Sequence, residues 1–212
     1  MCDNYPPDIK IVLLGNCGVG KRDIISRYID NTYKEYSSST IGANYSEKII
    51  KKDNKEYQLN IWDTAGQEKF HSLVKHYYKG AYIFCLVYDI TNQESFESLK
   101  TIWYPDLLKY GEKYIILAVV GSKGELYESE YIVDENKAKF FADEIGAIFH
   151  IVSAKNGDGI EKLFNTLIDK YLSQEFNSKL EEMLNFKGGN IKSLKLTKSN
   201  SEKGPIKKKE FC

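Results

Sequence analysis

Two short stretches of this sequence have the residue types and spacing that bind phosphate groups. The first is Gly-Asn-Cys-Gly-Val-Gly-Lys-Arg at residues 15–22, which follows the aliphatic run 9–14 and precedes apolar residues at helical spacing. In a strand, glycine loop and helix of this kind, backbone N–H groups converge on phosphate oxygens and the helix N-terminus adds positive charge. Lys21 would reach the terminal phosphates. Taken alone, the stretch is also consistent with an ordinary glycine turn.

The second stretch is Trp-Asp-Thr-Ala-Gly-Gln-Glu at residues 62–68. It follows residues 57–61, which we predict to be a buried strand. Asp63 is therefore expected at a strand end beside a glycine-containing loop, where open α/β sheets bind nucleotide phosphates and their metal. Seven specified residues match by chance on the order of once in a billion positions, so coincidence does not explain the string.

Together these stretches resemble the phosphate loop and second switch of Ras-superfamily GTPases, and of the Rab branch in particular. Residues 41–45, 69–80 and 86–91 are also similar to Rab sequences. The resemblance implies an α/β P-loop NTPase fold, a Ras-like G domain, that binds GTP, GDP and Mg²⁺ and slowly hydrolyses GTP. It also implies effector contacts through residues 37–45 and 62–80, with exchange and GTPase-activating factors as further partners.

The resemblance also assigns roles to single residues. Gln67 would be catalytic by orienting the attacking water, while the Gly66 amide would meet the γ-phosphate. Thr40, and Asp63 through water, would hold Mg²⁺. Tyr33 would lie against the edge of the base. The nucleotide-binding residues implied in this way are Gly15, Asn16, Cys17, Gly18, Val19, Gly20, Lys21, Arg22, Tyr33, Thr40, Asp63, Gly66, Ser122, Lys123, Glu125, Ser153, Ala154 and Lys155.

Arg22 departs from the pattern of the phosphate loop. The family has Ser or Thr after the lysine because that hydroxyl ligates Mg²⁺. A guanidinium cannot coordinate a cation and brings its own positive charge. Asp23 lies about 100° further around the helix and is not placed to substitute. Either Arg22 turns away and leaves a weakened metal site, or it lies over the phosphates as a partial electrostatic surrogate.

The base-recognition motif is also altered. Ser122-Lys123-Gly124-Glu125 stands where the family has Asn-Lys-x-Asp, whereas Ser153-Ala154-Lys155 matches the last base motif. The family's aspartate accepts two guanine N–H groups with one carboxylate, and Glu125 is one methylene longer. Ser122 lacks the amide that ties this loop to the phosphate loop. We expect guanine preference to survive in weakened form, by roughly ten- to a hundred-fold in affinity.

The order of predicted elements indicates one α/β domain. We expect six strands, at residues 9–14, 45–52, 57–62, 82–88, 115–120 and 147–152, in a mostly parallel sheet whose second and third strands pair antiparallel. We expect helices on both faces at residues 21–31, 69–78, 93–109, 134–145 and 159–175. The predicted organisation is a short extension (1–8), a G domain (9–175), and the end of the last helix with a disordered basic tail (176–212).

Composition narrows the classes of function. Thirty basic residues balance thirty acidic ones, so nothing predicts nucleic-acid binding. No apolar run reaches 18 residues and the N-terminus is polar, which predicts neither a membrane span nor a signal peptide. Three histidines and four scattered cysteines show no metal-ligand spacing. We therefore expect a cytoplasmic protein with free thiols.

The tail after Phe186 carries eight lysines and two glutamates, a net charge of +6 (8 − 2). It is either a solvated linker or a membrane anchor in which residues 207–209 bind anionic lipid beside a lipidated Cys212. Cys212 is the final residue, so the end is neither a CaaX box nor the double cysteine common in Rab proteins. Anchoring would place the protein peripherally on intracellular endomembranes or vesicles.

Two functions remain open on these residues. The first is a Rab-like switch in membrane trafficking, with effectors binding an aromatic patch of Trp62, Phe70 and Tyr78 in the triphosphate state. The second is a pseudo-GTPase, a binding module with weak or no nucleotide turnover, which the residues at 22, 122 and 125 favour.

Overall fold

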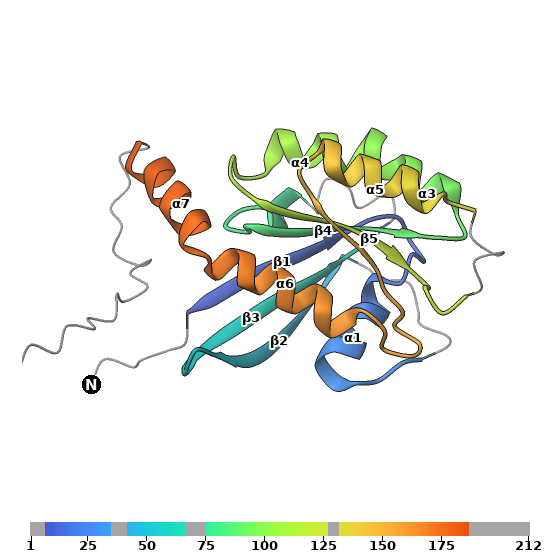
Figure 1. Cartoon of the computed structure of the whole chain (residues 1–212), viewed down its shortest axis with the longest axis horizontal. Helices are drawn as coiled ribbons and strands as arrows, with labels where there is room; N and C mark the ends of the chain where they lie inside the picture. The colour runs from blue at the N-terminus through green and yellow to red at the C-terminus, as the bar shows by residue number, and fades with distance from the viewer. Residues whose placement is uncertain (1–6, 35–41, 67–74, 127–131, 187–212) are drawn as a thin grey trace, which may run out of the picture.

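The computed structural model describes residues 7–34, 42–66, 75–126 and 132–186. Within these ranges six strands form one sheet in the order β2-β3-β1-β4-β5-β6 (Figure 1). All neighbouring pairs are parallel except β2 and β3, which are antiparallel. The α/β fold class predicted from the sequence is confirmed, including the antiparallel pair. The strands are β1 (Asp8–Leu14), β2 (Ala43–Lys52), β3 (Lys55–Thr64), β4 (Ile83–Asp89), β5 (Ile116–Ser122) and β6 (Ile148–Ile151).

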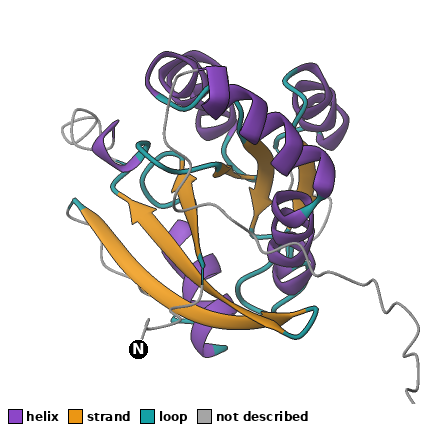
Figure 2. Cartoon of the chain, turned by 90° about the vertical axis from the view of Figure 1, so that its left-hand side faces the viewer, coloured by secondary structure: helices purple, strands orange, loops and turns teal. Residues whose placement is uncertain are grey.

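Helices cover both faces of the sheet, as Figure 2 shows in a view turned by 90°. The helices are α1 (Lys21–Asp30), α3 (Gln93–Ser98), the π-helical segment η3 (Leu99–Trp103), α4 (Tyr104–Tyr110), α5 (Glu135–Glu144), α6 (Ile160–Leu172) and α7 (Gln174–Phe186), with a 3₁₀ turn η2 (Lys75–Tyr77). No helix among the described residues combines the length and apolar character needed to cross a membrane.

The central strand β1 shows how the pattern of residues creates two cores. Its side chains alternate between the faces of the sheet. Ile11 and Leu13 pack with α1, α6 and α7, whereas Val12 and Leu14 pack with α3, η3, α4 and α5. Because β1, β3, β4, β5 and β6 are parallel, their carboxyl ends meet at one edge of the sheet. Loops that follow these strands are therefore brought together although they are far apart in the sequence.

The predicted helix over residues 93–109 is not one regular α-helix. Its middle, η3, is π-helical, with the Tyr104 N–H donating to the Leu99 carbonyl. Pro105 follows immediately. Proline has no N–H to donate to the residue four positions earlier, and its ring crowds that carbonyl. A local π segment relieves this conflict. The predicted helix at 69–78 falls mostly outside the described residues, and its described end is the 3₁₀ turn η2 rather than an α-helix.

The predicted last helix is two helices. The apolar stripe of α6 is buried as expected, but extended backbone at Ser173 ends it. The Ser173 hydroxyl then accepts a hydrogen bond of 3.2 Å from the Phe176 N–H and caps α7. Phe176 and Leu180 are buried, and the Phe176 ring contacts Tyr114, with centroids 4.9 Å apart. The core therefore continues past residue 175.

Candidate nucleotide site

Five parallel strands each bring one part of the candidate site to the carboxyl edge of the sheet. The phosphate loop follows β1, Asp63 lies near the end of β3, Asp89 ends β4, Ser122 ends β5, and Ser153 follows β6. This is the edge at which open α/β sheets bind ligands. We describe its phosphate end first and its base end second.

The phosphate loop is held tightly against the sheet at its start. Gly15 has φ 144°, and a Cβ there would lie 2.1 Å from the Val87 carbonyl oxygen on β4. Only glycine fits so close an approach in this conformation. Gly18, in contrast, has nothing within 4 Å of its Cβ position. The loop is thus anchored at one end and open where a phosphate group would lie, and the residues fit such a group.

Lys21 is the first residue of α1 and is only 5% exposed. Its ammonium donates to the carbonyl oxygens of Gly15 (2.7 Å) and Asn16 (2.8 Å). Burial lowers the pKa of Lys21 from 10.5 to about 8, although the nearby Asp63 carboxylate opposes the shift. Two of the three ammonium protons are thus committed to the loop, and the third remains to donate to a phosphate.

The end of β3 is coupled to the same loop. The Thr64 hydroxyl donates to the Leu13 carbonyl oxygen on β1 at 2.7 Å. A Cβ on Gly66 would lie 2.2 Å from the Cys17 backbone nitrogen and 2.5 Å from the Asn16 carbonyl oxygen. The backbone of the predicted second switch therefore touches the phosphate loop, and glycine is required at the contact.

The metal part of the site fits Mg²⁺ only in part. Asp63 is buried at the predicted position, with 3% of its surface exposed. Arg22 is half-buried as the second residue of α1, where the resemblance calls for a hydroxyl ligand. In the described part of the chain, no three His, Cys, Asp or Glu residues form a cluster that could hold a metal alone. Among the described residues, Asp63 would therefore hold Mg²⁺ together with phosphate oxygens and water.

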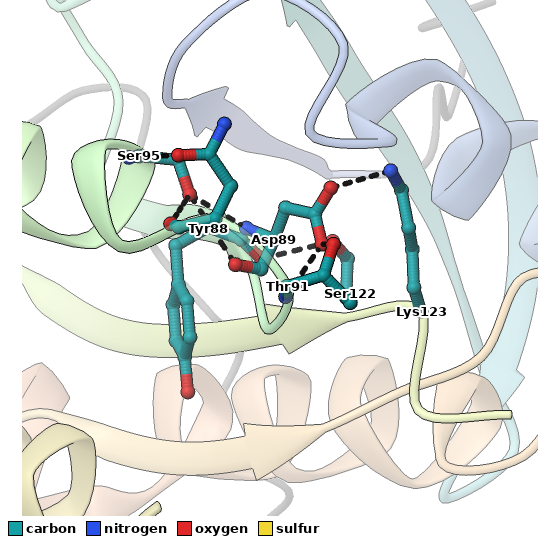
Figure 3. A network of polar contacts seen from close by, with 7 residues as sticks. Tyr88, Asp89, Thr91, Ser95, Ser122 and Lys123 are labelled. Atoms are coloured by element: carbon teal, nitrogen blue, oxygen red, sulfur yellow. Dashed lines mark hydrogen bonds and ion pairs between the residues drawn. The ribbon is translucent and has the colours of Figure 1, made fainter. Parts of the chain in front are cut away.

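At the base end, Ser122 and Lys123 turn toward β4 (Figure 3). The Ser122 hydroxyl donates to the Tyr88 carbonyl oxygen at 2.8 Å. Lys123 adopts a left-handed conformation, with φ 68°, and its ammonium pairs with Asp89. The other Asp89 oxygen accepts from the N–H and hydroxyl of Thr91, at 2.9 and 2.7 Å. Ser122 still lies beside the phosphate loop, since its hydroxyl is 3.8 Å from the Cβ position of Gly20.

Glu125 and Ser153 join the two base loops directly. The Ser153 hydroxyl donates to Glu125 Oε2 at 2.6 Å and also accepts from the Asn156 N–H at 3.2 Å. Glu125 is half-buried. With Oε2 bonded to Ser153, the carboxylate is oriented from one side and its second oxygen can accept from a ligand. The longer side chain is thus accommodated, and it joins the loops after β5 and β6.

Arg27 on α1 fixes the loop that contains Ala154 and Lys155. Its Nε donates to the Ala154 carbonyl oxygen (2.6 Å) and Nη2 to that of Lys155 (2.7 Å). Nη1 donates to the carbonyl and side-chain oxygens of Asn31, which caps α1 with φ 53°. One guanidinium therefore connects the last base motif to the end of α1, where the chain continues toward the predicted first switch.

The predicted aromatic patch of Trp62, Phe70 and Tyr78 is wrong at Tyr78, and Phe70 lies outside the described residues. Tyr78 is 1% exposed and packs edge-on against Phe84 in the core, so it is unavailable to a partner. Tyr77 takes its place, with its ring 4.8 Å from Trp62, and Tyr45 lies 5.0 Å away on the other strand of the hairpin. Tyr77 ends η2 and Tyr78 follows it, and the two adjacent rings pack against different residues. We call Tyr45, Trp62 and Tyr77 the aromatic cluster.

Several predicted residues cannot be placed. Thr40, Gln67, Phe70 and Cys212 lie outside the described residues. Tyr33 is described and half-buried in the segment after α1. The structure thus brings together the phosphate loop, Asp63 and Gly66, and separately Ser122, Lys123, Glu125 and the loop at 153–155.

Sequence reasoning missed the residues that support these loops. Asp89 could have been found, because it ends a predicted strand at the edge where the other motifs meet. Arg27 and Trp103 carried no such signal, because each acts through contacts with residues more than 80 positions away. Sequence spacing does not report contacts of that range.

The phosphate loop, the strand-end carboxylate and the two base loops define a P-loop nucleotide-binding protein. The chain matches the Ras family over residues 10–173 and belongs to that family of small GTPases. Proteins of this family bind GTP and GDP with Mg²⁺, hydrolyse GTP, and act as switches with effectors, exchange factors and activating factors.

Proposed function

We propose that this protein is a Rab-like switch that acts in vesicle and membrane trafficking, with slow GTP hydrolysis and with weakened Mg²⁺ and guanine binding. In this proposal GTP orders the segments around residues 32–44 and 64–80, effectors bind them, and hydrolysis assisted by Gln67 resets them. Exchange and activating factors set the timing.

The observation that carries the switch is the contact of Gly66 with the phosphate loop. A bound γ-phosphate would lie where Gly66 meets Asn16 and Cys17, so its presence or absence changes this contact directly. Lys21 adds a positive charge beside it. A difference of one phosphate group can therefore be transmitted to the second switch.

The aromatic cluster supports the Rab-like part of the proposal. Trp62 directly precedes Asp63 in the sequence, and its ring contacts those of Tyr45 and Tyr77. Tyr45 is 43% exposed, and Trp62 and Tyr77 are each partly exposed. Aromatic residues of this kind contribute strongly to protein interfaces. A surface so close to the switch is suited to an effector that distinguishes GTP from GDP.

The first experiment is a titration with fluorescent GDP and GTP analogues, with and without Mg²⁺, using an ATP analogue as competitor. We expect guanine-selective binding that Mg²⁺ strengthens less than in a site with the usual hydroxyl. Hydrolysis is followed by chromatography of the bound nucleotide. No binding at micromolar nucleotide would instead favour the pseudo-GTPase, for which Arg22, Ser122 and Glu125 are the supporting residues.

Two variants separate the possible effects of Arg22. Arg22→Ser supplies the missing hydroxyl and removes the charge, whereas Arg22→Ala removes the charge alone. If loss of the ligand weakens Mg²⁺, only Arg22→Ser strengthens the Mg²⁺ dependence of GDP release, by about ten-fold or more. Equal effects of both variants would assign the weakness to charge repulsion. No effect of either would show that Mg²⁺ binding is not impaired at this position.

The site of action is proposed from the tail. Eight lysines between residues 187 and 209, at about 1 kcal/mol for each charge near an anionic surface, favour reversible membrane attachment beside a lipidated Cys212. We expect lipidated protein to cosediment with vesicles containing phosphatidylserine, and a Cys212→Ser variant to do so weakly. Mass spectrometry of protein from eukaryotic cells tests the lipid itself. If Cys212 is unmodified and the protein does not cosediment with vesicles, the tail is a linker and not a membrane anchor.

A further inference from the structure

Asn16 in the phosphate loop has side-chain contacts that phosphate binding does not require. Its Nδ2 donates to the Ser98 hydroxyl at 2.9 Å, and its Oδ1 accepts from the Trp103 indole N–H at 2.8 Å. Both ends of the amide are therefore bonded to residues more than 80 positions away. Trp103 is 1% exposed and Ser98 is 8% exposed, so these contacts are made at the wall of the core rather than in solvent.

The π-helical segment η3 brings Ser98 and Trp103 to the same loop. In a regular α-helix, residues five positions apart point about 140° away from each other. The i→i+5 hydrogen bonding of η3 widens the turn and brings such residues near one face. Ser98 is fixed in turn, because its hydroxyl donates to the Glu94 carbonyl oxygen at 2.8 Å. The irregular part of this helix is thus what allows both contacts with Asn16.

The backbone of Asn16 links these contacts to the phosphate site. Its carbonyl oxygen accepts from the Lys21 ammonium at 2.8 Å. The same carbonyl oxygen lies 2.5 Å from the Cβ position of Gly66. A rotation of Asn16 would therefore move an acceptor of Lys21 and the surface on which Gly66 rests.

We propose that Ser98 and Trp103 are positioning residues for the phosphate loop, which they hold through the Asn16 side chain. They touch no nucleotide themselves. By fixing Asn16, they keep the Lys21 ammonium aimed at the phosphates and keep the Gly66 contact in place. This inference rests on the proposed nucleotide function, and it assigns to the π-helical segment a role in retaining nucleotide.

The test compares Ser98→Ala with Thr101→Ala in the full chain. Both variants remove a hydroxyl that donates to the carbonyl four residues earlier, but only Ser98 contacts Asn16. We expect Ser98→Ala to release fluorescent GDP about three- to ten-fold faster than the wild type. Thr101→Ala should release it at the wild-type rate. Thermal melting of both variants checks that the folded state is retained.

Trp103→Phe removes the indole N–H and should act on the same residue. If Asn16 mediates both effects, the double variant Ser98→Ala/Trp103→Phe releases GDP more slowly than the product of the single effects predicts. The chain has two tryptophans, so Trp62→Phe leaves the Trp103 indole as a single ¹⁵N–¹H signal. We expect that signal to shift when GDP binds, which a purely structural role would not produce, and the GDP-induced shift to be smaller when Ser98 is replaced.

The outcomes separate the inference from the function on which it rests. If the wild type binds GDP, but Ser98→Ala and Trp103→Phe release it at the wild-type rate, the positioning role is wrong and the nucleotide function stands. Should Trp103→Phe fail to fold, Ser98→Ala and the indole signal still decide. If the wild type binds no GDP under any condition, both proposals are wrong.

Discussion

The phosphate end and the base end of the candidate site are built from different materials. At the phosphate end the cradle is backbone, namely the glycine loop after β1 and the Gly66 contact, with Lys21 as its buried charge. At the base end the contacts are made by side chains, those of Ser122, Lys123 and Glu125.

Because of this difference, we expect a substitution to have different consequences at the two ends. Backbone N–H groups are present whatever the side chain, so Cys17 can vary without removing a phosphate donor. Asn16 is different, because its side chain contacts Ser98 and Trp103. When a side chain recognises a base, a substitution removes the recognising group itself. We therefore expect the departure at Arg22 to affect the metal more than the phosphates, and the departures at residues 122 and 125 to act on base selectivity itself.

Removing the charge of Lys21 should abolish most of the phosphate affinity of the site. Lys21→Met is expected to weaken GDP binding by about a hundred-fold or more, because a charge-assisted hydrogen bond to phosphate is lost in a buried site. Isothermal titration measures this. Lys155→Met removes an exposed lysine of the base end and should cost far less. An equal loss in both variants would contradict a phosphate end that depends on one buried charge.

The pH dependence of binding tests the same charge without mutation. Phosphate favours the ammonium form, and Lys21 has a pKa of about 8 because it is buried. Below pH 8 the lysine is already protonated and affinity is constant. Above pH 8 it must take up a proton, so GDP binding should weaken as pH rises, by about ten-fold at pH 9.

Titration calorimetry in buffers of different ionisation enthalpy detects this proton uptake. Cys17→Ser removes a thiol whose charge raises the pKa of Lys21, so the variant should begin to lose affinity at a slightly lower pH. A profile that is flat between pH 7 and 9 would show that Lys21 does not titrate in this range.

Shortening the side chain at residue 125 should increase the selectivity of the base end for guanine. Glu125→Asp brings back the carboxylate length of the family motif and is expected to raise the preference for GDP over inosine diphosphate by about five- to ten-fold. Glu125→Gln keeps the length, removes the charge, and should lower that preference. If Asp and Gln change selectivity in the same direction, the carboxylate does not read the base.

Replacing Arg27 should have the smallest effect on GDP binding of the changes considered. Arg27→Lys can replace only one of its contacts with the base loop, so we expect GDP release about three-fold faster. Stopped-flow exchange measures the rate. Asn31→Gly is the control, since it removes one side-chain acceptor of Arg27 while glycine accepts φ 53°. Release by Arg27→Lys that is no faster than release by Asn31→Gly would contradict a role for the Arg27 contacts with the base loop.

Much of the site was readable in the sequence because its motifs are local. The phosphate loop, Asp63 and Gly66, and the loops at residues 122–125 and 153–155, each stand directly after a strand. Strands of alternating or continuous apolar residues predict their own positions. The parallel order then forces their ends together, so the neighbourhood of these motifs followed without knowledge of any side-chain contact.

The predictions from sequence were wrong where tertiary packing or a single residue overrides a local pattern. Residues 93–109 carry a helical pattern, but Pro105 cannot supply a hydrogen bond, and η3 results. Tyr77 and Tyr78 are adjacent tyrosines, and only their packing decides that Tyr78 is buried against Phe84 while Tyr77 is half-buried beside Trp62. The break at Ser173 between α6 and α7 depends on a hydroxyl cap that a continuous apolar stripe conceals.

The sequence by itself determined the α/β class, the family's phosphate and base motifs, and the residues at which those motifs depart from the pattern. The class follows from hydrophobic periodicity, and the motifs and their departures follow from the resemblance to the family over short stretches of sequence. Only the tertiary structure decided that Arg27 holds the base loop and that Ser98 and Trp103 hold Asn16. Such contacts join distant segments, and their partners are selected by the packing of helices on the sheet rather than by any local pattern.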